Sequence, residues 1–236
     1  MNQNNLIKLT ITTFLVIFFC EKSYSASKEL LKADWSFAGP TGKFDRPSLQ
    51  RGYQVYKEVC SSCHSMKYLS YRNLGQKGGP EFSLDEVKAI AAGYEIEDGP
   101  NSDGEMFTRP GRPSDHFKNP YPNDNASIAA NGGAYPPDMS VLVKARPGGA
   151  NYIYSILMGY EEKPVDFVLE EGVYYNKYID GNKIKMMNPL SNDIIEYSDG
   201  TNANVDQMSK DVTTFLTWAA EPHLEARHKT GTKVII

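Results

Sequence analysis

The sequence predicts a mostly α-helical domain with long loop insertions and small β pieces. Apolar residues recur at helical spacing in four segments, and irregular stretches separate these segments. Glycine and proline contribute 19 and 14 of the 236 residues, a share that indicates extensive loops. An apolar content of 40% with 23% charged residues is that of a globular chain, and it excludes collagen, a coiled coil or full disorder. A formal net charge of −4 argues against a nucleic-acid-binding protein, which normally carries a basic face.

The four predicted helices cover residues 48–60, 84–94, 150–159 and 204–220. Pro47 suits the first turn of the first helix, Ser83 can cap the second, and Pro222 ends the fourth. The first helix contains Gly52 among aromatic neighbours. Either the first and last helices cross closely at Gly52, or this glycine merely lowers helix stability by about 1 kcal/mol.

Two regions between the helices are predicted to be irregular. Residues 95–140 are rich in Gly, Pro, Asn and Asp, which favours an ordered but irregular loop region. Residues 165–197 are divided by turns and contain strand-like pieces such as residues 172–175. The first region carries an acidic cluster made of Glu95, Glu97, Asp98, Asp103 and Glu105. From the residue types alone, an ordinary solvated loop explains this cluster.

The amino-terminal segment predicts a secretory signal peptide at residues 1–25. Lys8 gives a weakly positive start, and residues 9–20 form a short apolar stretch that small residues follow. This stretch is shorter than the roughly 18 apolar residues that a membrane span needs. An uncleaved anchor is the alternative. A mitochondrial presequence would carry several arginines, and this segment has none.

The carboxyl-terminal end combines positive and apolar residues. Arg227, His228, Lys229 and Lys233 form a positive cluster of the kind that flanks membrane segments, and residues 234–236 are apolar. Two interpretations stay open. The end is either a frayed polar tail or the opening of a spanning helix that the sequence does not contain.

Residues 60–64 read Cys-Ser-Ser-Cys-His, the pattern of covalent haem c attachment. Two cysteines three apart on a helical turn can form thioethers with the two vinyl groups of one haem, and His64 then lies beneath the iron. Export fits, because this attachment is completed outside the cytoplasm. A zinc site would need four ligands, and no second cysteine or close histidine pair completes the set. A dithiol redox site would need a thioredoxin-like βαβ context, which is absent from the predicted elements.

The sixth ligand of the iron separates the possible functions. An open position would indicate ligand binding or peroxidase-like chemistry, whereas a His/Met pair indicates electron transfer. Met186 and Met187 lie in a loop with Gly, Asn and Pro rather than on a helical face, which suits a ligand presented from the far side of the haem. His116, His223 and His228 are the other candidates.

Ordered blocks of the sequence resemble cytochrome c1, the haem-bearing subunit of the quinol–cytochrome c reductase (cytochrome bc1) complex. The blocks comprise residues 51–64, 71–74, 130–140, 144–149, 152–160, 172–176 and 211–222. The resemblance implies a class I cytochrome c-like haem domain over residues 26–228. Because this family normally ends in one transmembrane helix after an Arg/Lys-rich stretch, residues 229–236 are expected to be the start of a truncated membrane anchor.

The resemblance also implies how one covalently attached haem c is held. Cys60 and Cys63 would form the thioethers, His64 would be the proximal ligand, and Met186 would be the distal ligand. Met187 is the competing register, and the alignment of the preceding loop with the family favours Met186.

The same resemblance assigns further residues to the haem pocket. Arg146 and Tyr152 would contact the haem propionates, which suits a guanidinium facing a carboxylate. From the residues alone, Arg146 would be an ordinary surface arginine. Asn131 and Pro137 would line the pocket.

The resemblance finally implies a function and partners. The haem would take electrons from a Rieske iron–sulfur protein and pass them to a cytochrome c, in a membrane complex with cytochrome b that is expected to be dimeric. The chain would be an electron-transfer subunit rather than an enzyme on its own, at the bacterial inner membrane with its haem on the periplasmic side. In such a complex the acidic cluster would attract a basic cytochrome c. The alternatives are a free periplasmic c-type cytochrome and a haem peroxidase-like enzyme.

Overall fold

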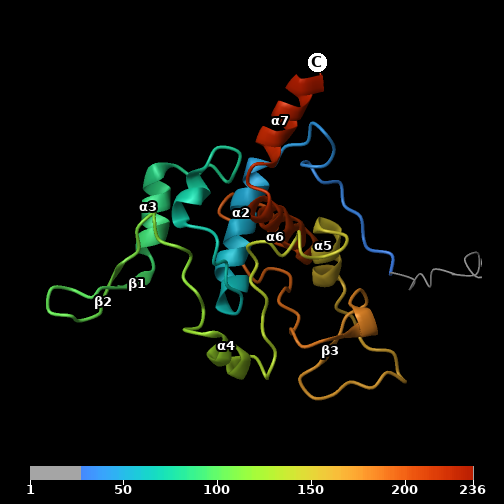
Figure 1. Ribbon diagram of the computed structural model, residues 1–236. Helices are drawn as coiled ribbons and strands as arrows, with labels where there is room; N and C mark the ends of the chain where they lie inside the picture. Colours follow the sequence, from blue (N-terminus) through green and yellow to red (C-terminus); the bar gives the residue numbers. More distant parts are fainter. Residues whose placement is uncertain (1–27, 236) are drawn as a thin grey trace, which may run out of the picture.

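The computed structural model describes residues 28–235, so the predicted signal peptide at residues 1–25 lies outside the described residues. The helices are α2 (Arg46–Glu58), α3 (Leu84–Ala92), α4 (Asp124–Ala130), α5 (Ala150–Met158), α6 (Val205–Ala220) and α7 (Leu224–Ile235). The strands are β1 (Glu95–Asp98), β2 (Phe107–Pro110), β3 (Tyr174–Tyr175) and β4 (Lys183–Ile184). Short 3₁₀ turns cover Cys60–Ser62, Tyr71–Gly75 and Asp180–Asn182. The prediction of a mostly α-helical domain with small β pieces is confirmed. Helices α2 and α6 lie at its centre (Figure 1).

The four predicted helices form close to their expected positions, and side-chain caps begin three of them, α2, α3 and α6. Asp45 precedes α2, and its carboxylate accepts a hydrogen bond from the backbone N–H of Ser48 at 3.1 Å. Ser83 caps α3 as predicted. Its hydroxyl accepts from the backbone N–H of Glu86, while the Glu86 carboxylate accepts from the Ser83 N–H.

Helices α2 and α6 cross at Gly52, which settles the two interpretations of this glycine. A Cβ atom at Gly52 would lie 2.1 Å from the carbonyl oxygen of Asp211 and 2.7 Å from the Cβ atom of Phe215. Both contacts are far inside van der Waals distance, so only a glycine allows this approach. The close crossing predicted from the sequence is therefore correct.

An ion pair between Arg51 of α2 and Asp211 of α6 stabilises the same crossing. Asp211 is fully buried on α6, and its two carboxylate oxygens accept hydrogen bonds from the Arg51 guanidinium at 2.8 and 3.1 Å. The Ser48 hydroxyl and the Gln207 amide also donate to this carboxylate, at 2.7 and 3.0 Å. Because every partner is present, the buried charge is compensated where the two helices meet.

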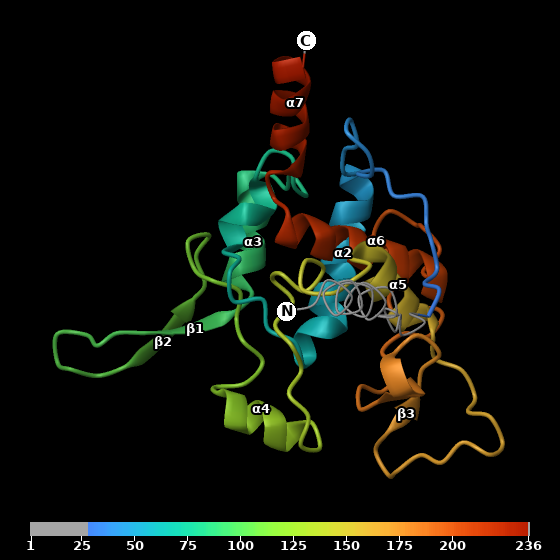
Figure 2. The same cartoon turned by 45° about the vertical axis from the view of Figure 1, so that its right-hand side comes forward.

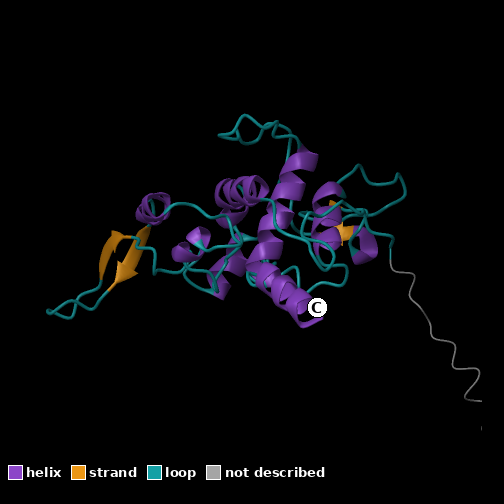
Figure 3. Cartoon of the chain, turned by 90° about the horizontal axis from the view of Figure 1, so that it is seen from above, coloured by secondary structure: helices purple, strands orange, loops and turns teal. Residues whose placement is uncertain are grey.

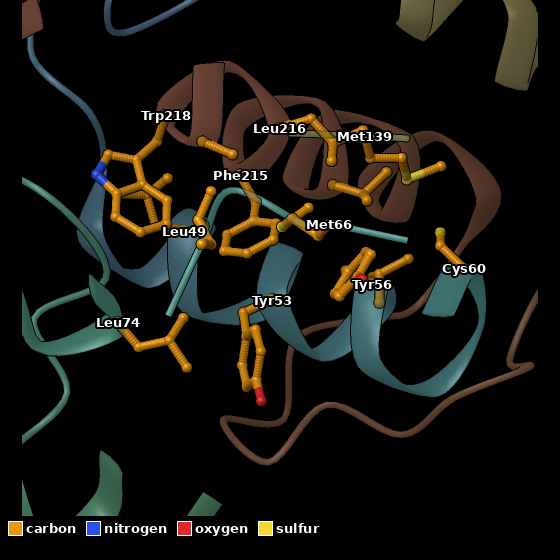
Figure 4. Packing of buried hydrophobic residues seen from close by; sticks show 14 of the residues in the cluster. Leu49, Tyr53, Tyr56, Cys60, Met66, Leu74, Met139, Phe215, Leu216 and Trp218 are labelled. Atoms are coloured by element: carbon orange, nitrogen blue, oxygen red, sulfur yellow. The ribbon is translucent and has the colours of Figure 1, made fainter. Parts of the chain in front are cut away.

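The core between the two helices is mainly aromatic and aliphatic. Phe215 and Trp218 of α6 lie over Leu49 and Tyr53 of α2, with Leu74 at one edge (Figure 4). The rings of Phe215 and Tyr53 have centroids 5.7 Å apart, and those of Phe215 and Trp218 are 5.6 Å apart. Tilted rings at these separations pack favourably beyond the area they bury.

The region predicted to be irregular, residues 95–140, contains two strands and a helix. Strands β1 and β2 form an antiparallel hairpin that projects from the body of the molecule (Figure 2), and α4 follows it. Arg109 on β2 bonds to Asp98 on β1 and to Asp115 beyond the hairpin. These bonds give the hairpin a fixed base. The acidic cluster lies on β1 and on the tip that joins the two strands.

The second small sheet lies on the other side of the helical core. Strands β3 and β4 pair through Tyr174 with Ile184 and Tyr175 with Lys183. Viewed from above, the two sheets are separated by the helices (Figure 3). The strand-like pieces predicted within residues 165–197 thus correspond to a real hairpin.

Helix α7 leaves the body at the end opposite to α4 (Figures 1 and 2). The Glu225 carboxylate accepts two hydrogen bonds from the Arg46 guanidinium, both at 2.8 Å, and a third from the Phe44 N–H. His228 contacts the carbonyl oxygen of Gly42 at 2.9 Å. Within residues 28–235, no helix has the length and apolar character of a membrane span.

Candidate haem site

The two motif cysteines lie at the carboxyl end of α2, where the helix tightens into the 3₁₀ turn. The backbone N–H groups of Cys63 and His64 both donate to the carbonyl of Cys60, at 3.2 and 2.9 Å. No disulfide joins the two cysteines. Cys60 lies beyond Tyr56 at the end of the helix (Figure 4). Sequence positions three apart are therefore presented on one tight turn, as attachment to a single haem requires.

The chemistry of the thiols does not fit the alternatives that the motif left open. Burial raises the pKa of the Cys60 thiol to about 12, so this thiol is protonated at neutral pH and is a poor redox nucleophile. In the part of the chain that the structure describes, no three His, Cys, Asp or Glu side chains group so as to hold a metal ion. A zinc site is disfavoured, and Cys60 is disfavoured as the attacking thiol of a dithiol site.

His64 is buried and its imidazole is oriented by the chain. Only 8% of the residue is exposed, and Nδ1 lies 2.8 Å from the carbonyl oxygen of Pro137. A carbonyl can only accept, so Nδ1 carries the proton and the lone pair is on Nε2. This is the arrangement in which a histidine serves as a metal ligand, with its other nitrogen held by a backbone carbonyl. Pro137, which the resemblance places in the pocket, makes this contact through its backbone carbonyl.

Asp138 fixes the segment that carries this carbonyl. Its Oδ2 accepts from the Ser65 hydroxyl and the Lys67 N–H, both at 2.8 Å, and its Oδ1 accepts from the Ser140 N–H at 2.9 Å. Burial opposes ionisation of this carboxyl, but the hydrogen bonds outweigh burial and lower its pKa. The Met139 N–H also donates to the Ser65 carbonyl at 2.8 Å. Residues 65–67 and 138–140 are thereby joined beside His64.

The two candidate methionines differ in exposure. Met187 is 63% exposed, whereas Met186 is partly buried and its carbonyl oxygen accepts a hydrogen bond from the Tyr160 hydroxyl at 3.0 Å. Burial raises the pKa of Tyr160, so its hydroxyl remains a donor at neutral pH. The Lys185 ammonium donates to the carbonyl of Gly132 at 3.0 Å. These differences favour Met186 as the residue held in place for ligation.

The predicted propionate contacts, Arg146 and Tyr152, lie on one short stretch before and within α5. Arg146 is half-buried, and its guanidinium makes one hydrogen bond, to the adjacent carbonyl of Ala145 at 3.2 Å. Among residues 28–235 no carboxylate pairs with it. The partly buried Tyr152 hydroxyl likewise makes no hydrogen bond to any described residue. A half-buried cation without an acidic partner fits a site for an anionic group.

Asn131 has a structural position at the end of α4. Its backbone N–H and its side-chain amide both donate to the carbonyl of Ser127, at 3.2 and 2.7 Å. The residue therefore caps the carboxyl end of α4. The carbonyl of the next residue, Gly132, accepts the hydrogen bond from Lys185, which directly precedes Met186. Its predicted place in the haem pocket stays a prediction.

The family of the protein follows from comparison with known sequences. The Cytochrome C1 family matches residues 35–236. The chain belongs to the cytochrome c1 family. The resemblance drawn from the sequence blocks is confirmed.

Individual cytochrome c1 relatives cover most of the chain. The cytochrome c1 of Rhodospirillum rubrum is 50% identical over 223 residues, which cover 88% of this chain and 81% of that protein. The mitochondrial heme protein cytochrome c1-2 of Solanum tuberosum is 50% identical over 201 residues, or 85% of this chain and 76% of that protein. The cytochrome b/c1 of Bradyrhizobium diazoefficiens is 52% identical over 221 residues, which are 86% of this chain but only 32% of that longer protein.

Sequence reasoning missed two residues of the candidate site, Asp138 and Tyr160. Each lies in a block that resembles cytochrome c1, but the residue type alone gives no role. Their contacts join segments that are 71 and 26 positions apart in the chain. Only the folded structure reveals such contacts.

Proposed function

We propose that this cytochrome c1, a haem-containing electron-transfer subunit, takes electrons from a Rieske iron–sulfur protein and passes them to a cytochrome c. One haem would be bound through Cys60 and Cys63, with His64 and Met186 as the two axial ligands of the iron. The observation that carries the proposal is the hydrogen bond from His64 Nδ1 to the Pro137 carbonyl, which leaves Nε2 available as a ligand.

A bound haem would supply a one-electron centre, and no substrate bond would be made or broken. The residues of this chain would set the properties of that centre. His64 and Met186 would close both axial positions, and methionine ligation raises the reduction potential. Arg146 and Tyr152 would face the propionates. Burial of His64 and Cys60 would keep water from part of the pocket.

The different-class alternative is a haem peroxidase-like enzyme with an open distal position. Tyr160 holds the backbone of Met186, which is a feature of a closed site. Substitution of Met186 by Leu is expected to abolish the far-red absorption band of methionine-ligated ferric haem, to lower the midpoint potential and to permit carbon monoxide binding. Met187→Leu is the matched control and should leave all three unchanged. A wild-type protein that binds carbon monoxide readily, or an unchanged Met186→Leu variant, would refute the assignment.

The acceptor is proposed to be a basic cytochrome c that meets the acidic hairpin. Glu95 and Glu97 lie on one face of β1 and are exposed, whereas Asp98 is partly neutralised by Arg109, which lowers the pKa of this carboxyl. Unpaired carboxylates at the hairpin would raise the association rate with cytochrome c more than they raise the affinity. We therefore expect Asp98 to contribute less to this attraction than Glu95 and Glu97.

Salt dependence tests the acceptor site. The rate of cytochrome c reduction should fall as ionic strength rises, because exposed charges are screened over about 10 Å at 0.1 M. The double variant Glu95→Gln, Glu97→Gln should flatten this dependence. Asp85→Asn, at an exposed carboxylate on α3, is the control. A salt profile that the double variant leaves unchanged would rule out the hairpin.

The assembly and location are also proposed from the family. The subunit would work in a membrane complex with cytochrome b and the Rieske protein, dimeric and at the bacterial inner membrane, with its haem on the periplasmic side. Positive residues on α7 are consistent with an approach to a membrane. Purification of the protein from native membranes in one assembly with cytochrome b and a Rieske protein would support this proposal. Recovery of the haem protein alone would favour the free periplasmic cytochrome.

A further inference from the structure

Residues 185–189, which present the candidate distal ligand, have few backbone contacts. They follow β4, which ends at Ile184, and they precede Leu190, which is 3% exposed. Among the described residues, no backbone–backbone hydrogen bond involves residues 185–189. A loop of this kind has many conformations available, and each would place the Met186 thioether differently. Something outside the loop has to hold it.

Tyr160 supplies that contact. Its hydroxyl donates to the carbonyl oxygen of Met186 at 3.0 Å, and 26 residues separate the two in the chain. The side-chain contact of Lys185 with Gly132 comes from an exposed lysine, whose solvated ammonium gains less from such a bond. The tyrosine is thus the partly buried tether of the ligand residue itself.

The backbone of Tyr160 is in turn rigidly placed. Tyr160 is the second residue after α5 and forms an isolated antiparallel bridge with Asn176. Asn176 is fully buried, and its amide donates to the carbonyl of Ile156 in α5 at 2.7 Å. Gly159 allows this packing, because a Cβ atom there would lie 2.6 Å from the Asn176 side-chain oxygen. The hydroxyl therefore extends to Met186 from a fixed support.

We propose that Tyr160 is a positioning residue for the distal haem ligand: its hydroxyl holds the Met186 carbonyl and so restricts the loop to conformations in which the thioether can reach the iron. This inference rests on the proposed ligation by Met186. Tyr160 does not contact the iron. It acts on the equilibrium between a bound and a displaced methionine.

The test is Tyr160→Phe in the mature haem-loaded protein, which keeps the ring and removes only the hydroxyl. Haem attachment and the helical circular dichroism should be unchanged. The far-red methionine–iron band should fade at lower temperature than in the wild type. The apparent affinity of the reduced protein for carbon monoxide should rise by about tenfold, which corresponds to about 1.4 kcal/mol.

Tyr68→Phe is the matched control. This tyrosine is exposed, and its hydroxyl makes no hydrogen bond to any described residue, so the variant should match the wild type in both readouts. A Tyr160→Phe protein with wild-type band stability and carbon monoxide affinity overturns the inference. Met186→Leu separates this outcome from failure of the ligand assignment, because loss of the band in that variant shows that Met186 is the ligand.

A second measurement requires no substitution. In the reduced wild-type protein, the Tyr160 hydroxyl proton should exchange with solvent more slowly than that of an exposed tyrosine such as Tyr68, which is 73% exposed. Exchange as fast as at Tyr68 would also overturn the inference.

Discussion

Substitution of Gly52 by alanine tests the helix crossing on which the domain is built. The added Cβ atom would lie 2.1 Å from the Asp211 carbonyl oxygen, 2.6 Å from its carbonyl carbon and 2.7 Å from the Phe215 Cβ atom. Two of these three atoms are backbone, so no side-chain rotation relieves the overlap. Helices α2 and α6 would have to separate by roughly 1 Å to reach ordinary contact, and overpacking of this kind costs about 3 kcal/mol.

The assay is guanidinium unfolding of the haem-bearing protein, followed by circular dichroism, with the free energy obtained by linear extrapolation. Gly231→Ala is the matched control, because Gly231 lies in α7 and a Cβ atom there would meet nothing within 4 Å. That variant should be neutral or more stable by up to about 1 kcal/mol, since alanine favours a helix. If Gly52→Ala is no less stable than Gly231→Ala, the account of the crossing is wrong.

Two further predictions concern ion pairs. Replacing Arg51 by Gln leaves the buried Asp211 carboxylate without its main partner and should lower the free energy of unfolding by about 3 kcal/mol, whereas Arg72→Gln, at an exposed arginine, should change it little. Equal losses in the two denaturation curves would contradict this. The hydrogen bonds from Arg109 lower the pKa of Asp115 from 3.8 to about 2, so the stabilisation is complete above pH 3.8 and is lost as the pH falls toward 2. Asp115→Asn should therefore weaken the acid dependence of stability in that window, and an unaltered acid titration of unfolding would count against the pair.

The helices were predictable because their signals are local. Each segment carries an apolar stripe, and some add a capping residue or a first-turn proline, as Ser83 and Pro47 illustrate. The β1–β2 hairpin was missed because its strands have only four residues and its tip is long. Helix α4 was missed because its seven residues include few large apolar side chains. The hairpin also depends on the contacts of Arg109 with Asp98 and Asp115, which no local pattern reveals.

The candidate site likewise has residues that the sequence predicts and residues that only the fold reveals. Residues 60–64 form a contiguous motif whose spacing follows from covalent chemistry, so the sequence indicates the cofactor. The choice of Met186 over Met187 needed the family resemblance, and the structure supports it through exposure and a hydrogen bond. The roles of Asp138 and Tyr160 depend on pairing between distant segments.

The base of the β1–β2 hairpin has a consequence for how this domain can diversify. The Gly111 N–H donates to the carbonyl of Tyr94 at 2.8 Å, which closes residues 95–110 into an arm with its own boundary. Shortening the arm or replacing its charged residues would leave the hydrogen bonds around His64 intact. If the arm is the acceptor site proposed above, preference for a redox partner can change without a change in the potential of the iron.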